Sequence, residues 1–135
     1  MKAYSSRRKV ITINKYMTLG ILKDNIHDIT KDLQNILNVH FEEHESSYWG
    51  EYTVAILSER ESIKLTYNYV DDDWQEEEFK QYPLLLKLNR VKEPEKMMNL
   101  LCSKLSYITP LYLEEIEARV GRRKYYNDDR QDEVY

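Results

Sequence analysis

The chain has 135 residues, 33% of them charged and 41% hydrophobic, and a formal net charge of −4 at pH 7. This length corresponds to about one domain, the apolar content excludes a wholly disordered chain, and no apolar run approaches the 20 residues of a membrane-spanning helix. The negative balance also argues against nucleic acid as the principal ligand, because phosphate backbones are bound by basic surfaces.

Cysteine content and the start of the chain favour a cytoplasmic protein. Cys102 is the only cysteine, so no internal disulfide can form, and no charged and then apolar leader opens the sequence. Cys102 lies in a Met-rich helical pattern and is interpreted as a buried structural thiol. We expect a single domain over residues 1–135, with flexible tails at residues 1–9 and 122–135.

The first predicted elements are a short strand and a long helix. Alternation over residues 10–13 indicates an edge strand that follows a basic start. Apolar residues then recur at gaps of three and four, which predicts an amphipathic helix over residues 19–37 with Thr18 as its N-cap. Its apolar stripe consists of Ile26, Ile29, Leu33, Ile36 and Leu37.

The middle of the chain predicts strands. Residues 52–57 and 63–69 both alternate between apolar and polar side chains and are separated by a polar turn, as in an antiparallel hairpin. Residues 84–88 form a third, mostly buried strand that begins after Pro83, where a missing backbone donor is tolerated.

The last third predicts two more helices. One spans residues 94–107 from Pro94, and the other spans residues 110–120, with Pro110 at its first position and Gly121 at its end. The fold class expected from all these elements is α+β: a small antiparallel sheet of three to five strands with about three helices packed on one face.

One short motif has the spacing of a metal site. His40, Glu43 and His44 match the H-x-x-E-H pattern of inverted zinc peptidases, in which the histidines bind zinc and the glutamate is the general base. Glu114, or Glu115 beside it, would supply the third ligand. Against this interpretation, residues 39–45 alternate like a strand and could be either helix or strand. We therefore expect no metal, no cofactor and no catalysis, and keep a small zinc hydrolase as an alternative.

The most unusual stretch is acidic and aromatic. Six carboxylates surround one tryptophan within residues 71–78, which is either a solvated loop or a surface for a basic partner. Tyrosine and tryptophan side chains provide large contact areas at interfaces. The residues predicted to bind a partner are Asp71, Asp72, Asp73, Trp74, Glu76, Glu77, Glu78, Tyr48, Trp49, Tyr67 and Tyr69. A calcium site is not expected, because no glycine-containing twelve-residue loop is present.

The chain over residues 19–88 resembles bacterial immunity proteins, which neutralise polymorphic or contact-dependent growth inhibition toxins. The resemblance rests on the helix ending in Ile36-Leu37, on Ser47-Tyr48-Trp49-Gly50-Glu51-Tyr52 entering a hairpin, on Asn68, and on Glu78-Phe79 before Tyr82-Pro83-Leu84-Leu85. It implies a small cytoplasmic α+β protein without catalytic activity that occludes a toxin domain by shape and charge. A phage or mobile-element accessory interaction protein is a further alternative, and the sequence does not define the oligomeric state.

Overall fold

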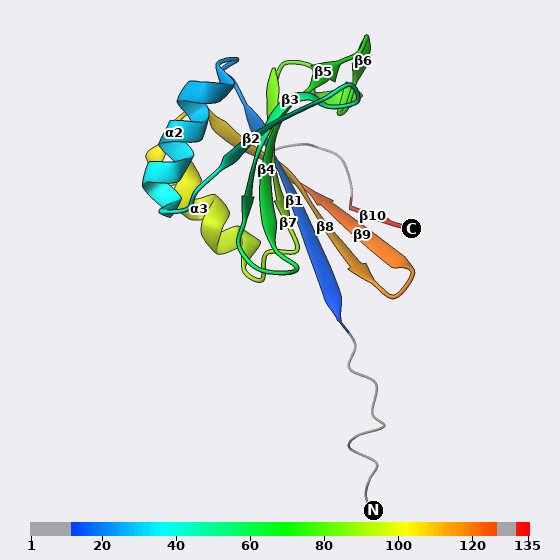
Figure 1. Cartoon of the computed structure of the whole chain (residues 1–135). Helices are drawn as coiled ribbons and strands as arrows, with labels where there is room; N and C mark the ends of the chain where they lie inside the picture. Colours follow the sequence, from blue (N-terminus) through cyan, green and yellow to red (C-terminus); the bar gives the residue numbers. More distant parts are fainter. Residues whose placement is uncertain (1–11, 127–131) are drawn as a thin grey trace, which may run out of the picture.

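The computed structural model describes residues 12–126 and 132–135, which form an antiparallel sheet with two helices on one face (Figure 1). The strands of the main sheet are β1 (Ile13–Ile21), β2 (Glu42–Ser46), β3 (Gly50–Ile56), β4 (Ser62–Tyr67), β7 (Leu84–Asn89), β8 (Ile108–Glu117), β9 (Val120–Tyr125) and β10 (Glu133–Val134). Their order is β10-β9-β8-β1-β7-β4-β3-β2. The helices are α2 (Ile26–Leu37) and α3 (Pro94–Lys104), and a small ribbon of β5 (Tyr69–Val70) and β6 (Asp73–Trp74) precedes a 3-10 turn, η1 (Glu77–Phe79).

The expected fold class was wrong. The main sheet has eight strands rather than three to five, and the described residues contain two α-helices rather than three. The helix predicted over residues 19–37 begins with three residues that belong to a strand, and the helix predicted over residues 110–120 lies mostly within strands. Both errors lie at β1 and β8, which are neighbours in the sheet over their whole lengths.

Strand β1 replaces the beginning of the helix predicted from residue 19. Met17, Leu19 and Ile21 are fully buried and alternate with residues that face the other side, which is the period of a strand. Gly20 is required here because a Cβ atom would lie 2.5 Å from the ring of Tyr82. Thr18, predicted as an N-cap, is a buried residue within this strand.

Helix α2 confirms the apolar stripe but begins later than predicted. Its N-cap is Asn25, whose side chain accepts a hydrogen bond from the backbone of Asp28 at 3.1 Å. It ends at Asn38, which adopts a left-handed conformation that asparagine tolerates. Ile29 and Leu33 lie in the core between α2 and the sheet.

The hairpin, the third strand and the second helix are confirmed. Strands β3 and β4 pair in antiparallel register, β4 pairs with β7, and α3 begins at Pro94 as expected. These strands and both helices contribute to the larger hydrophobic core, which lies on the helix-covered face of the sheet. A smaller cluster lies on the other face and consists of Phe79, Tyr82, Leu85, Leu111, Tyr112 and Tyr125.

The helix predicted over residues 110–120 is the other error, because this segment is β8 followed by the start of β9. Thr109 and Pro110 resemble a helix start, but Pro110 pairs with Leu19 at an irregularity in the β1–β8 register. The β8–β9 ladder begins only at Tyr112, so the missing donor of Pro110 is tolerated. Gly121 lies within β9 rather than ending a helix.

The ends of the chain were expected to be tails. On the C-terminal side, residues 122–125 belong to β9, and β10 adds a short edge strand, so this part of the expectation was wrong. On the N-terminal side, residues 1–9 and the first two residues of the strand expected at residues 10–13 lie outside the described residues. Of the other two, Thr12 precedes the strand and Ile13 is the first residue of β1.

Candidate functional site

The acidic run forms an ordered projection, here called the acidic arm (residues 69–79), beyond the end of β4 (Figure 1). Strands β5 and β6 are joined by Asp71 and Asp72, which both have positive φ angles of 55° and 62°. This is the geometry of a type I′ turn, which favours Asp, Asn and Gly at both central positions. Two of the six carboxylates therefore have a structural reason to be there, and the same turn exposes them.

Asn68 fixes the base of the acidic arm. It is fully buried, and its side-chain amide donates to the backbone oxygens of Phe79 and Tyr82, each at 3.0 Å. Its side-chain oxygen accepts from the backbone N–H of Glu76 at 2.8 Å. The side chain of Gln75 adds a bond to the Tyr67 carbonyl at 2.6 Å. The arm is therefore held in one shape by buried hydrogen bonds at its two ends.

Aromatic side chains accompany the carboxylates on the arm. The ring centroids of Tyr69 and Trp74 lie 4.8 Å apart, and Lys80 lies 5.7 Å from the Trp74 ring. Tyr69 is half exposed, whereas Phe79 is buried against the sheet. The arm thus offers apolar surface beside its charges, as interface hot spots do.

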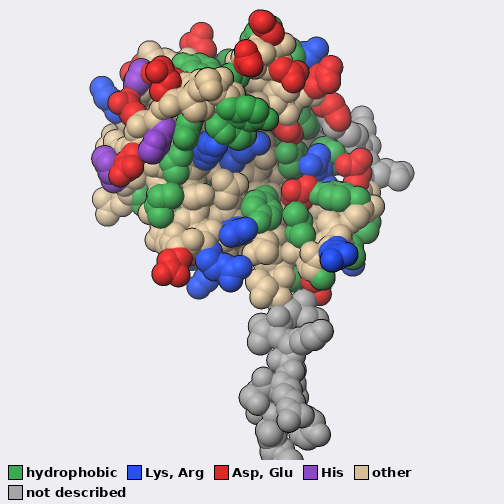
Figure 2. Space-filling view, turned by 45° about the vertical axis from the view of Figure 1, so that its right-hand side comes forward, with side chains coloured by type: hydrophobic (Ala, Val, Ile, Leu, Met, Phe, Trp, Pro, Cys, Tyr) green, Lys and Arg blue, Asp and Glu red, His purple; other side chains and the backbone are tan. Residues whose placement is uncertain are grey.

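A hollow of about 390 Å³ separates the arm from the turn between β2 and β3. The turn is closed by a bond from the backbone of Trp49 to the side chain of Ser46 at 2.8 Å, and Gly50 follows with a positive φ of 68°. The hollow is lined by Tyr48, Trp49, Val70, Asp71, Asp73, Trp74, Gln75 and Lys87. In Figure 2, Lys and Arg side chains lie within this side of the molecule below hydrophobic ones, while Asp and Glu gather along its upper edge.

An ionic and aromatic network lies on the same sheet face, towards β9. The Arg123 guanidinium donates to the Glu114 carboxylate at 2.9 Å and lies 4.2 Å from the ring centroid of Tyr112. Burial is the main cause that raises the pKa of Tyr112, and the nearby Glu76 carboxylate raises it further. The Tyr125 hydroxyl donates to Glu133 at 2.8 Å. Arg123, Glu114 and Glu133 therefore have partners within the molecule.

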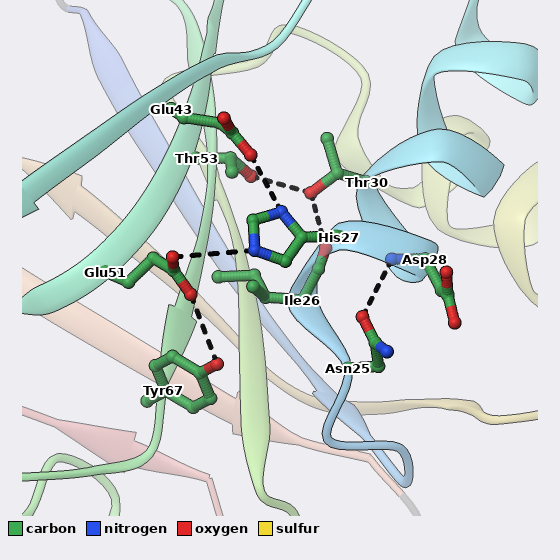
Figure 3. Close-up of polar contacts among 9 residues, drawn as sticks. All are labelled: Asn25, Ile26, His27, Asp28, Thr30, Glu43, Glu51, Thr53 and Tyr67. Atoms are coloured by element: carbon green, nitrogen blue, oxygen red, sulfur yellow. Dashed lines mark hydrogen bonds and ion pairs between the residues drawn. The ribbon is translucent and has the colours of Figure 1, made fainter.

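A second polar cluster joins α2 to β2 and β3 on the helix-covered side (Figure 3). His27 lies between two carboxylates, with Nδ1 2.7 Å from Glu43 and Nε2 3.5 Å from Glu51. The Tyr67 hydroxyl donates to Glu51 at 3.5 Å, and its ring packs against the main core. Tyr67 therefore faces away from the hollow, unlike Tyr48, Trp49 and Trp74, which line it.

The zinc motif does not have the helical geometry that its chemistry requires. His40 lies in a loop before β2, and His44 lies within β2, stacked on Tyr52. Glu114 is on β8, five interstrand steps from β2 and so roughly 24 Å away along the sheet. Over residues 12–126 and 132–135, no group of three His, Cys, Asp or Glu side chains is placed to hold a metal ion.

The structure brings together part of the predicted site and adds residues that sequence reasoning missed. Tyr48, Trp49, Asp71, Asp73 and Trp74 line one hollow although they come from two separate loops. Glu77 and Glu78 are exposed on η1 of the same arm.

The missed residues are the lysines of the sheet face; Asn68 was part of the resemblance, but its role in holding the arm was missed. A signal existed for each: Lys87 interrupts a run of leucines, and Lys64 and Asn68 lie on the polar side of an alternating strand.

Comparisons of this chain with protein-family models, with curated proteins and with solved structures found no match. Among the described helices, neither α2 nor α3 is long and apolar enough to cross a membrane. Function therefore has to be inferred from the acidic arm and the hollow beside it.

Proposed function

We propose that this chain is a binding protein without catalytic activity that neutralises a toxin domain in the cytoplasm, as immunity proteins do. The acidic arm engages a basic surface of that domain and covers it. The proposal is supported by one observation above all: the carboxylates are carried by an ordered projection whose base is fixed by the buried side chain of Asn68. A solvated loop that served only solubility would need no such anchor.

Preorganisation and charge explain what the arm contributes to binding. An arm that is already ordered loses little conformational freedom on association, so more of the contact energy appears as affinity. Its exposed carboxylates attract a basic partner over about a Debye length, which speeds encounter at low salt. Trp74 then supplies desolvated contact area at the centre of the charges.

The experiment uses the product of the adjacent gene as the candidate partner and measures association and dissociation rates at low and high salt. In the test variant, Asp71, Asp72 and Asp73 are replaced by Asn, which the left-handed turn positions tolerate as well as Asp. We expect the on-rate to fall at least tenfold at low salt and its salt dependence to weaken.

A matched control removes three exposed carboxylates at the opposite end of the sheet. Glu59, Glu93 and Glu117 lie there and are replaced together by Gln, which changes the net charge by the same amount. The control should keep most of the wild-type on-rate. Equal effects in the two triple variants would show that overall charge, and not the acidic arm, governs binding and would contradict the proposal.

A further inference from the structure

Two lysines lie directly opposite each other at the centre of the sheet face that the helices leave open. Lys64 on β4 pairs in register with Lys87 on β7, and their neighbours along both strands are buried in the main core. Because side chains alternate along a strand, the two lysines point away from that core and toward the side of the hollow. Like charges opposite each other on a sheet are destabilising unless something compensates them.

No carboxylate compensates this pair directly. Among the described residues, neither lysine forms an ion pair within 4.0 Å, and Lys64 contacts ring faces instead, at 3.6 Å from the centroid of Trp49 and 4.6 Å from that of Tyr52. Burial is the main cause that lowers the pKa of Lys64, and the nearby Lys87 ammonium lowers it further. Burial also lowers the pKa of Lys87, despite the attraction of Glu76 on the arm.

The nearby carboxylates already have partners. Glu114 binds Arg123, and Glu76 forms a hydrogen bond with the Tyr112 hydroxyl. A further polar group on the same face lacks a partner: the Thr66 hydroxyl is buried without a hydrogen bond, two residues from Lys64 on β4. The two ammonium groups thus have no carboxylate at ion-pair distance among the described residues, and a bound anion would supply the missing acceptor.

We propose that Lys64 and Lys87 form a binding site for one oxyanion, a carboxylate or a phosphate group, on the open sheet face beneath Trp49. An oxyanion accepts charge-assisted hydrogen bonds from both ammonium groups at once. Asp71 and Asp73 line the same hollow as Lys87 and repel further negative charge, so the rest of the ligand is neutral or cationic and polyanions are excluded. This anion site does not depend on the proposed protein partner. If the protein bound no oxyanion, the proposal that the acidic arm binds a basic partner would be unaffected.

Intrinsic fluorescence offers a direct test, because the only two tryptophans of the chain, Trp49 and Trp74, both line the hollow. The protein is titrated with inorganic phosphate and, separately, with acetate, while sodium chloride keeps the ionic strength constant. We expect a saturable change with at least one of these oxyanions and none with chloride alone. A response to phosphate only, or to both, identifies which oxyanion the site accepts.

Single substitutions show which residues cause the fluorescence response to the oxyanion. Lys64→Met and Lys87→Met should each weaken the apparent affinity at least tenfold, whereas Lys92→Met, at an exposed position, should not change it. Methionine preserves much of the side-chain volume and removes an unpaired charge, and far-UV circular dichroism confirms the fold. An absent or non-saturable response, or an equal response in Lys87→Met and the wild type, would overturn the proposal.

A second readout observes the lysines themselves. Carbon-13 NMR of the lysine ε-carbons reports their titration with and without phosphate. A bound anion stabilises the ammonium form, so the pKa of both residues should rise when phosphate is added. Unchanged titration of both lysines at phosphate concentrations that saturate the fluorescence signal would also refute the site.

Discussion

Replacement of Asn68 by alanine should release the acidic arm from the sheet. The substitution removes two hydrogen bonds to the carbonyls of Phe79 and Tyr82 and one from the backbone N–H of Glu76. Asn68 is fully buried, so its three partners lose a protein contact in a place where water replaces it poorly. The backbone bonds of residue 68 to Pro83 and Gln75 remain in the variant.

The magnitude follows from these three bonds. Each intramolecular hydrogen bond contributes about 1 kcal/mol net, and a buried group left without a partner costs more. The loss in the free energy of unfolding should therefore be about 3 kcal/mol, a large fraction of the 5–15 kcal/mol typical of a folded domain. Because the bonds join the arm to the sheet, hydrogen exchange should also accelerate locally over residues 69–79.

Urea denaturation followed by circular dichroism measures the loss of stability, with Asn89→Ala as the matched control. Asn89 is a partly buried asparagine whose amide makes one long bond, 3.4 Å, to the Ser62 hydroxyl. The control should lose less than about 1 kcal/mol. If Asn68→Ala loses no more stability than Asn89→Ala, or if the arm exchanges at the wild-type rate, then Asn68 does not fix the arm.

Three further variants test other parts of the fold. Gly20→Ala places a Cβ atom against the ring of Tyr82 and should cost about 1–3 kcal/mol by thermal denaturation; no loss would mean that the ring moves freely. Burial and the hydrogen bond to Asp32 raise the pKa of Tyr107, so the unfolded chain loses this proton first. Stability should therefore fall as pH rises above about 10, and Tyr107→Phe should show a shallower fall in pH-dependent denaturation; identical slopes would contradict this. His27→Gln removes the two half-exposed contacts of the imidazole with Glu43 and Glu51 and should change stability by less than about 1 kcal/mol, while a larger loss in urea denaturation would show that these contacts are structurally important.

The sequence predicted the helices and strands in which apolar residues follow a clear pattern. Helix α2, the β3–β4 hairpin and α3 were found because their apolar residues recur at the spacing of one secondary structure, and β7 was found as a short apolar run after Pro83. The boundary between β1 and α2 was missed, since Leu19 and Leu22 lie at helical spacing from the stripe of α2. The pairing of β1 with β7 and with β8 across the sheet identifies it as a strand.

Strand β8 was missed because local signals competed with tertiary structure. Thr109, Pro110 and Glu114 fit a helix start, but Leu111, Tyr112 and Leu113 are buried in succession. Consecutive buried residues fit a central strand covered on both faces, which depends on α3 packing on one face and Phe79 of the arm on the other. That information comes from residues far away in the chain.

The candidate site was predictable as a set of residue types but not as a surface. The acidic arm and its tryptophan were identified from composition. Tyr48 and Trp49 were identified as aromatic contact residues, and their segment also contributed to the resemblance. Their arrangement on two sides of one hollow depends on the sheet order, which places β3 and β7 on either side of β4. Tyr67 shows the limit of the approach, since one step along β4 reverses the face on which a residue lies.

Hydrogen–deuterium exchange of the complex with the product of the adjacent gene locates the interface directly. The account predicts that exchange slows over residues 69–79 and at the turn that carries Trp49, while the exposed turn at residues 57–61 exchanges as in the free protein. Protection confined to the helices or to the 57–61 end of the sheet, with the acidic arm unchanged, would contradict the proposal that the arm binds the partner.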